Sequence, residues 1–157
     1  MREQTGAIRL VTRYSLADAR EAGESLRVLV AEDNAVNQLF VTRMLEKRGH
    51  TVLVVNNGRE VLAALKKDDY DLILMDVQMP EMDGIDATLA IRKSEKERNN
   101  GSHQAIVALT AYAMKRDQER CEAAGMDGYL SKPIRPQELD RLLEGYVIAK
   151  TQANKTA

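Results

Sequence analysis

Three carboxylates and one lysine follow short apolar runs of the sequence. Glu32 and Asp33 come directly after one such run, Asp76 comes after a second, and Lys132 closes a third. Runs of this kind are typical of buried strands, and in an open α/β sheet ligands bind in the crevice at the carboxyl ends of the strands. Two like charges about 4 Å apart cost roughly 4 kcal/mol at an effective dielectric constant of about 20. We therefore expect a cation among these acids.

Mg²⁺ suits oxygen ligands of this kind. It takes one or two protein carboxylates and keeps waters and phosphate oxygens in its other positions, a role that fits Asp33 and Asp76, while Glu32 could hold a metal-bound water. The alternative is that Glu32, Asp33 and Asn34 only cap the helix that follows. Capping alone leaves the acid at the end of the other strand without a role.

Asp76 also has the chemistry of a nucleophile. A carboxylate can attack a phosphoryl group and form an aspartyl phosphate, and such a transfer depends mainly on positioning and on neutralising charge. Lys132 is placed to supply part of that charge, although a lysine at a strand end can also be a plain surface cation. Thr110 ends a fourth apolar run, and its hydroxyl can bond a phosphoryl oxygen or simply cap a helix.

The elements that would position these side chains follow a βα pattern. Apolar runs and helical stretches alternate after residue 25, which is typical of a parallel sheet. Strands are predicted at 27–31, 51–55, 72–75, 106–109 and 128–130. Helices are predicted at 36–48, 59–67, 84–96, 115–124 and 136–147. Gly49 and Gly125 stand where a left-handed residue would end a helix. We expect a linker over 1–25, one domain over 26–149 and a disordered tail over 150–157, with 99–104 as an exposed loop of little fixed structure.

Charge and composition limit the partners. The 157 residues carry 23 Lys and Arg against 24 Asp and Glu, a formal net charge of −1, so bulk electrostatics gives no reason to expect nucleic acid or an anionic membrane. The one cysteine, Cys121, cannot form an internal disulfide, which fits a reducing cytoplasmic setting, and we expect an idle structural thiol. His50 and His103 lie in predicted turns, where we expect exposed side chains that are not phosphodonors.

Four segments resemble the receiver domains of two-component response regulators. They are residues 28–34 (VLVAEDN), 74–84 (LMDVQMPEMDG), 108–111 (ALTA) and 130–133 (LSKP), in the order that the family has, and the resemblance spans about 26–147. It implies a flavodoxin-like doubly wound five-stranded parallel sheet of order 2-1-3-4-5 with helices on both faces.

The resemblance also implies roles for the site residues. Asp76 would accept a phosphoryl group from a partner histidine, and Mg²⁺ would be held by Asp33, Asp76 and the backbone carbonyl of Gln78, with Glu32 acting through water. Thr110 and Tyr129 would form a switch pair, in which the phosphate attracts the Thr110 hydroxyl and the Tyr129 ring turns inward. Tyr129 could instead be an ordinary core aromatic.

Two further implications concern the peptide at the lysine and the lifetime of the phosphate. The family resemblance predicts a cis peptide between Lys132 and Pro133, which only proline makes cheap. Gln78 and Tyr112 each stand two positions after a site residue, so they would flank the path of an attacking water and slow the loss of phosphate.

Within the family, the amino-acid sequences of three segments resemble those of receivers from hybrid sensor histidine kinases. Residues 31–34 (AEDN) followed by Asn37, residues 75–80 (MDVQMP) and an upstream linker-like stretch at 10–16 (LVTRYSL) carry this similarity. It implies a fragment of a longer kinase, a cytoplasmic location even where the parent is membrane-anchored, and a histidine kinase or histidine phosphotransfer domain as partner.

The first predicted helix gives a clue to that partner. Its apolar residues cover more than the roughly 100° stripe that a helix needs for its own core. We expect Val36, Leu39 and Phe40 to dock a histidine phosphotransfer helix bundle; the alternative is that all three pack internally.

Two other functions are alternatives to that of a receiver. A Mg²⁺-dependent phosphohydrolase with an aspartate nucleophile needs a second acid two residues later, where this chain has Gln78. A scaffold that is never phosphorylated predicts a damaged acidic pair or a missing lysine, and both are intact. We expect the isolated domain to assist its own phosphorylation and dephosphorylation without being an enzyme, and its output to pass through another part of a longer protein or a separate partner.

Overall fold

A five-stranded parallel sheet forms the centre of the molecule. The structure, a computed structural model, describes residues 25–111 and 114–156. The strands are β1 (Arg27–Ala31), β2 (Thr51–Val55), β3 (Leu72–Asp76), β4 (Ile106–Thr110) and β5 (Gly128–Ser131). Their order is β2-β1-β3-β4-β5, and every neighbouring pair is parallel. The predicted flavodoxin-like order is therefore confirmed.

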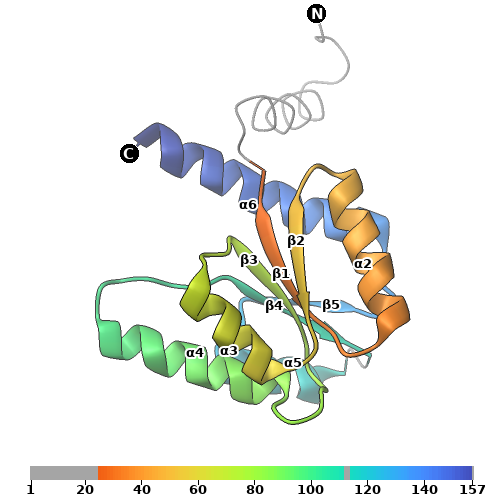
Figure 1. The fold of residues 1–157 in the computed structure, drawn as a ribbon, viewed down its shortest axis with the longest axis vertical. Helices are drawn as coiled ribbons and strands as arrows, with labels where there is room; N and C mark the ends of the chain where they lie inside the picture. Colours follow the sequence, from red (N-terminus) through yellow and green to blue (C-terminus); the bar gives the residue numbers. More distant parts are fainter. Residues whose placement is uncertain (1–24, 112–113, 157) are drawn as a thin grey trace, which may run out of the picture.

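Helices cover both faces of this sheet (Figure 1). They are α2 (Ala35–Lys47), α3 (Gly58–Lys67), α4 (Gly84–Arg98), α5 (Lys115–Ala124) and α6 (Pro136–Thr156). One buried cluster joins α2 and α6 to one face of the sheet, and a second joins α3, α4 and α5 to the other. Strand β1 serves both clusters, since Val28 and Val30 enter the first while Leu29 and Ala31 enter the second. This alternation follows from the two-residue period of a strand.

The chain turns from strand to helix through capped junctions. The side chains of Asn34, Asn57 and Asp83 each accept a hydrogen bond from the backbone N–H three residues later, which fixes the first turns of α2, α3 and α4. Asparagine and aspartate are favoured at this position for that reason. Two helix ends agree with the sequence as well, because Gly49 and Gly125 have φ values of 87° and 102°.

The end of the chain differs from its prediction. In place of a disordered tail from residue 150, helix α6 continues to Thr156. No proline interrupts the helix after its first residue, and two contacts hold the extension: Lys150 Nζ lies 2.9 Å from the Ser25 carbonyl oxygen and 3.0 Å from Asp71 Oδ2. The predicted linker lies outside the described residues except for Ser25. No helix within the described ranges is long and apolar enough to cross a membrane.

The predicted turns of the two histidines are more ordered than expected. His50 is buried rather than exposed, because its Nδ1 accepts a hydrogen bond from the Leu26 N–H at 3.1 Å and so pairs a buried donor at the start of β1. His103 is about half exposed, but its Nε2 lies 2.7 Å from Asp127 Oδ1. The loop around it is fixed again at Gln104, whose N–H donates to Glu95 Oε2. The expectation of little fixed structure there is wrong.

Candidate functional site

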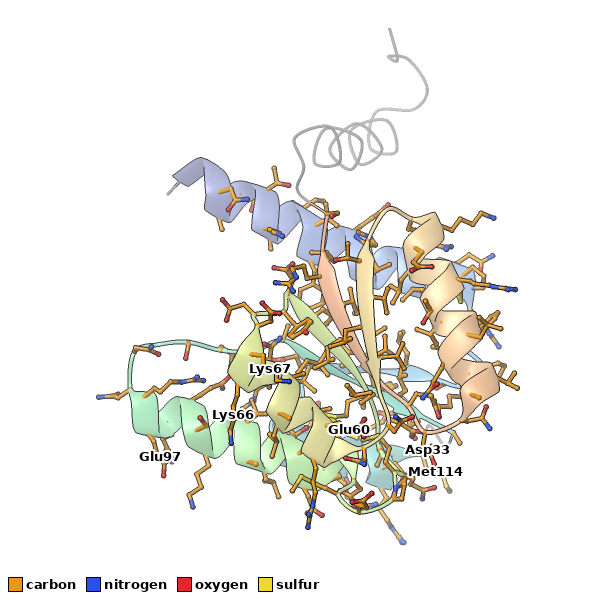
Figure 2. All side chains as sticks on the ribbon, in the orientation of Figure 1. Asp33, Glu60, Lys66, Lys67, Glu97 and Met114 are labelled. Atoms are coloured by element: carbon orange, nitrogen blue, oxygen red, sulfur yellow. The ribbon has the colours of Figure 1, made fainter. Side chains whose placement is uncertain are left out.

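The carboxyl ends of four adjacent strands bring the predicted residues together. Glu32 and Asp33 follow β1, Asp76 ends β3, Thr110 ends β4 and Lys132 follows β5. These strands are consecutive in the sheet, so their ends meet at one edge, where Figure 2 shows Asp33. A cleft of about 580 Å³ opens there, and all five side chains line it together with Gln78.

Three carboxylates converge in this cleft. One oxygen each from Glu32, Asp33 and Asp76 lies within 4.8 Å of the others. Glu32 and Asp76 are only 1% and 7% exposed, whereas Asp33 faces solvent. Burial of two acids this close is unfavourable unless cations balance them.

Lys132 supplies one of those cations. Its Nζ lies 2.8 Å from Glu32 Oε1 and 2.8 Å from Asp76 Oδ2. The backbone positions the side chain, because the Lys132 N–H donates to the Thr110 carbonyl oxygen at 2.8 Å and the peptide to Pro133 is cis, as predicted. The alternative of a plain surface cation is excluded by these contacts.

The protonation of the three groups follows from burial and from their mutual charges. Burial raises the pKa of Asp76, and the charge of Glu32 adds to this, so that Lys132 offsets the rise only in part. Burial also works to raise the pKa of Glu32, but Lys132 and the N–H of Asn34 outweigh it and lower the value. Burial opposes the charged form of Lys132, yet the two carboxylates raise its pKa, so the lysine stays charged.

The residues present fit a hard divalent cation. Glu32 Oε1 is buried and, apart from the ion pair with Lys132, has no partner with hydrogen-bond geometry. Its other oxygen accepts the Asn34 N–H at 3.1 Å. Two carboxylates with free oxygen lone pairs beside an exposed third are the ligand type that Mg²⁺ prefers. Asp33, Asp76 and the Gln78 carbonyl remain the predicted direct ligands.

The reach of Asp76 into the cleft depends on a glycine that the sequence reasoning did not single out. A Cβ on Gly84 would lie 2.3 Å from the Asp76 carbonyl oxygen, so the start of α4 can pack against the end of β3 only without a side chain. The Gly84 N–H also donates to the Val77 carbonyl oxygen at 3.0 Å. The signal was present in the sequence, as a glycine directly after the Asp83 cap.

Comparison with known families decides what kind of domain this is. The family model described as response regulator receiver domain matches residues 28–144, which is most of the chain. The chain belongs to the response regulator receiver family.

Curated relatives of this receiver include histidine kinases, some of them hybrid. It is 45% identical over 117 residues to the sensor histidine kinase GacS of Pseudomonas protegens, covering 74% of this chain and 13% of that protein. It is 40% identical over 136 residues to hybrid signal transduction histidine kinase I of Dictyostelium discoideum, covering 83% of this chain and 8% of that protein. The predicted resemblance to receivers of hybrid kinases is thereby confirmed, and the chain spans less than a fifth of the length of these relatives.

Solved structures of receivers have the same fold. The receiver domain of a sensor histidine kinase from Pseudomonas aeruginosa, with a magnesium ion in its active site cleft, has a TM-score of 0.69 at 39% identity and covers 78% of this chain and 98% of that chain. The receiver domain of Ssk1 from Saccharomyces cerevisiae, crystallised with the histidine phosphotransfer protein Ypd1, has a TM-score of 0.74 at 30% identity and covers 78% of this chain and 88% of that chain.

The predicted switch residues, Thr110 and Tyr129, differ in exposure. Thr110 is buried at the cleft, while Tyr129 is 43% exposed, so the alternative of a core aromatic is wrong. Their joint switching stays a prediction, and Tyr112 lies outside the described residues. Cys121 is buried, and burial raises the pKa of its thiol, as expected for a structural cysteine.

The predicted docking residues are on the surface. Val36, Leu39 and Phe40 of α2 are 75%, 52% and 47% exposed. The alternative that all three pack internally is therefore wrong. They lie on α2, whose N-cap residue Asn34 and first-turn residue Asn37 line the cleft.

Proposed function

We propose that this receiver accepts a phosphoryl group from a phosphohistidine onto Asp76 in a two-component phosphorelay, with Mg²⁺ as cofactor. The observation that carries the proposal is the position of Lys132 Nζ, 2.8 Å from both Glu32 and Asp76 beside a third carboxylate. Charge of both signs is thus concentrated around one nucleophilic oxygen, at the edge of the sheet where ligands bind.

The proposed reaction is a transfer between two nucleophiles. An oxygen of Asp76 forms a bond to phosphorus while the P–N bond of the donor breaks, and the electron pair of that bond returns to the imidazole nitrogen. Lys132 stabilises the negative charge on the phosphoryl oxygens, and Thr110 donates a hydrogen bond to one of them. Mg²⁺, held by Asp33, Asp76 and the Gln78 carbonyl with Glu32 acting through water, would supply further charge neutralisation.

The response to phosphorylation would run through Thr110 and Tyr129. A phosphate adds about 1.5 to 2 negative charges at pH 7, and the Thr110 hydroxyl lies at the same sheet edge as the acceptor. Movement of that hydroxyl toward the phosphate would leave space that the exposed Tyr129 ring can enter. Gln78 would shield the acyl phosphate from water, so Gln78→Ala should change the phosphate half-life.

We further propose a histidine phosphotransfer domain or a histidine kinase as the partner, docked on Val36, Leu39 and Phe40. The structural similarity to a receiver crystallised with a histidine phosphotransfer protein supports this partner. Phe40→Asp should slow phosphotransfer from a phosphorylated partner, whereas Leu89→Asp, at a similarly exposed leucine on α4, should not. Equal rates in the two variants would contradict the docking surface.

The parent protein is proposed to be a hybrid sensor histidine kinase with this receiver in the cytoplasm. The names of the curated relatives support a kinase parent. A phosphohydrolase is disfavoured because Gln78 stands where its second acid is needed. An unphosphorylated scaffold is disfavoured because the acidic pair and the lysine are intact and Lys132 contacts both Glu32 and Asp76.

The test is incubation with Mg²⁺ and a small phosphodonor such as acetyl phosphate, followed by intact mass measurement. Wild type should gain one phosphoryl group, Asp76→Asn should gain none, and Asp69→Asn, an exposed aspartate outside the cleft lining, should behave as wild type. A gain of the same mass in Asp76→Asn would place the phosphate elsewhere and overturn the proposal.

A further inference from the structure

We propose that the turn between β2 and α3, residues Asn56, Asn57 and Gly58, positions two loops of the metal site without touching metal or phosphoryl group. The two loops are the acidic loop, residues 32–34, and the acceptor loop, residues 77–83. The inference rests on the proposed function, because the ligands it positions are those of the proposed Mg²⁺ site. None of the three turn residues is among the residues that line the cleft.

The turn is bonded to the acceptor loop at two successive residues. The Gly58 N–H donates to the Met82 carbonyl oxygen at 2.8 Å, and Asn57 Nδ2 donates to Glu81 Oε2 at 3.4 Å. Glu81 has a φ of 63°, a left-handed conformation that few residues other than glycine adopt and that needs support from its surroundings. The two bonds provide such support at the middle of the loop that carries the Gln78 carbonyl.

Close packing at Gly58 fixes the same contact sterically. A Cβ at this position would lie 2.7 Å from Met82 Cγ and 2.8 Å from the Met82 carbonyl oxygen. Any side chain would therefore push the acceptor loop away from α3. The glycine is buried, so the added methyl group has no open direction.

The turn is also connected to the acidic loop. Gln38 Nε2 donates both to the Glu32 carbonyl oxygen and to Asn56 Oδ1, the second at 2.8 Å. The Glu32 N–H donates to the Val55 carbonyl oxygen at 3.0 Å, directly before the turn. The Glu32 N–H is thus bonded to the end of β2, and its carbonyl oxygen is linked to the turn through the Gln38 amide of α2.

One short segment therefore joins the loops that would supply ligands from opposite sides. Mg²⁺ requires nearly ideal octahedral geometry at short distances, so relative displacement of the two loops should weaken its binding. Replacing residues that hydrogen-bond to metal ligands, without binding the metal themselves, typically changes metal affinity by 10- to 100-fold. Substitutions in the turn should therefore lower the affinity for Mg²⁺ more than they lower the stability of the fold.

Asn57 allows capping and positioning to be separated. Its Oδ1 caps α3 by accepting the Glu60 N–H at 3.0 Å, while its Nδ2 bonds Glu81. Asn57→Asp keeps a good cap but loses the donor and faces the Glu81 carboxylate. The double variant Asn57→Asp, Glu81→Gln reverses donor and acceptor and restores the charge of the wild type.

The experiment measures the Mg²⁺ dissociation constant by isothermal titration calorimetry and the thermal midpoint in EDTA. Asn57→Asp should bind Mg²⁺ about tenfold more weakly, with a midpoint close to that of wild type, and the double variant should recover most of the affinity. An added negative charge alone would tighten binding of a cation, so the expected change has the opposite sign. In the metal-free protein, the Gly58 amide should exchange its hydrogen faster in the single variant.

Gly58→Ala should also weaken Mg²⁺ binding, with Gly145→Ala as the matched control because, apart from the adjacent residues and the backbone of its own helix, no atom lies within 4 Å of a Cβ there. If Gly58→Ala does not fold, the Asn57 variants alone test the positioning role. Unchanged affinity in Asn57→Asp, or a double variant as weak as the single one, would overturn the positioning role. A wild-type protein that binds no Mg²⁺ would instead overturn the proposed function on which this role rests.

Discussion

Replacing Lys132 by methionine should destabilise the metal-free receiver, and the loss should depend on pH. The variant keeps most of the side-chain volume but removes the ammonium that lies 2.8 Å from Glu32 Oε1 and from Asp76 Oδ2. Two nearly buried carboxylates would then face each other without a cation. Breaking a buried ion pair by removing one partner typically costs about 3–5 kcal/mol.

Protonation of Asp76 sets an upper limit to the free energy lost in the Lys132→Met variant. Burial and the charge of Glu32 already raise the pKa of Asp76, and Lys132 opposes that rise. Without the lysine, the carboxyl can take up a proton rather than remain charged. Protonating an aspartate of ordinary pKa, about 3.9, costs about 4 kcal/mol at pH 7 and about 1.5 kcal/mol at pH 5, at 1.36 kcal/mol per unit. The destabilisation should therefore be about 3–4 kcal/mol at pH 7 and less than half of that at pH 5.

The sign follows from proton linkage. In the variant, the folded protein holds a proton on Asp76 more tightly than the unfolded chain does, because its folded-state pKa is raised. Stability then falls as the pH rises above the unfolded value near 3.9, and the difference from wild type grows toward pH 7.

Urea unfolding in EDTA, followed by far-UV circular dichroism at pH 5 and pH 7, measures both quantities. Lys66→Met is the control, since Lys66 is exposed on α3 and lies away from Asp33 (Figure 2). The reasoning is refuted if Lys132→Met is as stable as this control at pH 7. It is also refuted if the loss of stability is the same at both pH values.

Two further predictions concern the metal and a helix end. Mg²⁺ at a hundredfold excess over its dissociation constant should stabilise wild type by about 2.7 kcal/mol and raise its thermal midpoint by roughly 5–10 °C. Asp33→Asn should show much less of this rise in the same melting experiment. Gly125→Ala should lower the free energy of unfolding by about 1–2 kcal/mol, because Gly125 has a φ of 102° and its Cβ would lie 2.9 Å from Arg92 Cγ. A urea midpoint equal to that of wild type would contradict this.

The sequence predicted the residues whose position depends on a strand end. Parallel strands covered on both faces are nearly continuous apolar runs, so the change from Met75 to Asp76 marks the end of β3. The same change from apolar to polar residues, from Leu109 to Thr110, marks the end of β4. Because the carboxyl ends of parallel strands share one edge, adjacency of the site residues followed from strand order alone.

The sequence could not predict contacts made by residues of ordinary type. His50 was expected in solvent because a histidine in a turn carries no sign that it will pair the Leu26 N–H across 24 residues. The extension of α6 was missed for a related reason. Polar residues after Lys150 suggest disorder, and the contact with Asp71 is visible only once two residues 79 positions apart in the chain are placed together.

The charge of the cleft gives a reason for a divalent cation in particular. With Lys132 charged and all three acids ionised, the site carries three negative charges against one positive charge, a net charge of −2. A monovalent ion would leave one charge uncompensated before a phosphoryl group, itself an anion, could approach Asp76. A divalent ion brings the site to neutrality, and only then does the attack of one anion on another avoid a large Coulomb cost. Na⁺ at a concentration of equal ionic strength should therefore not replace Mg²⁺ in the phosphorylation experiment.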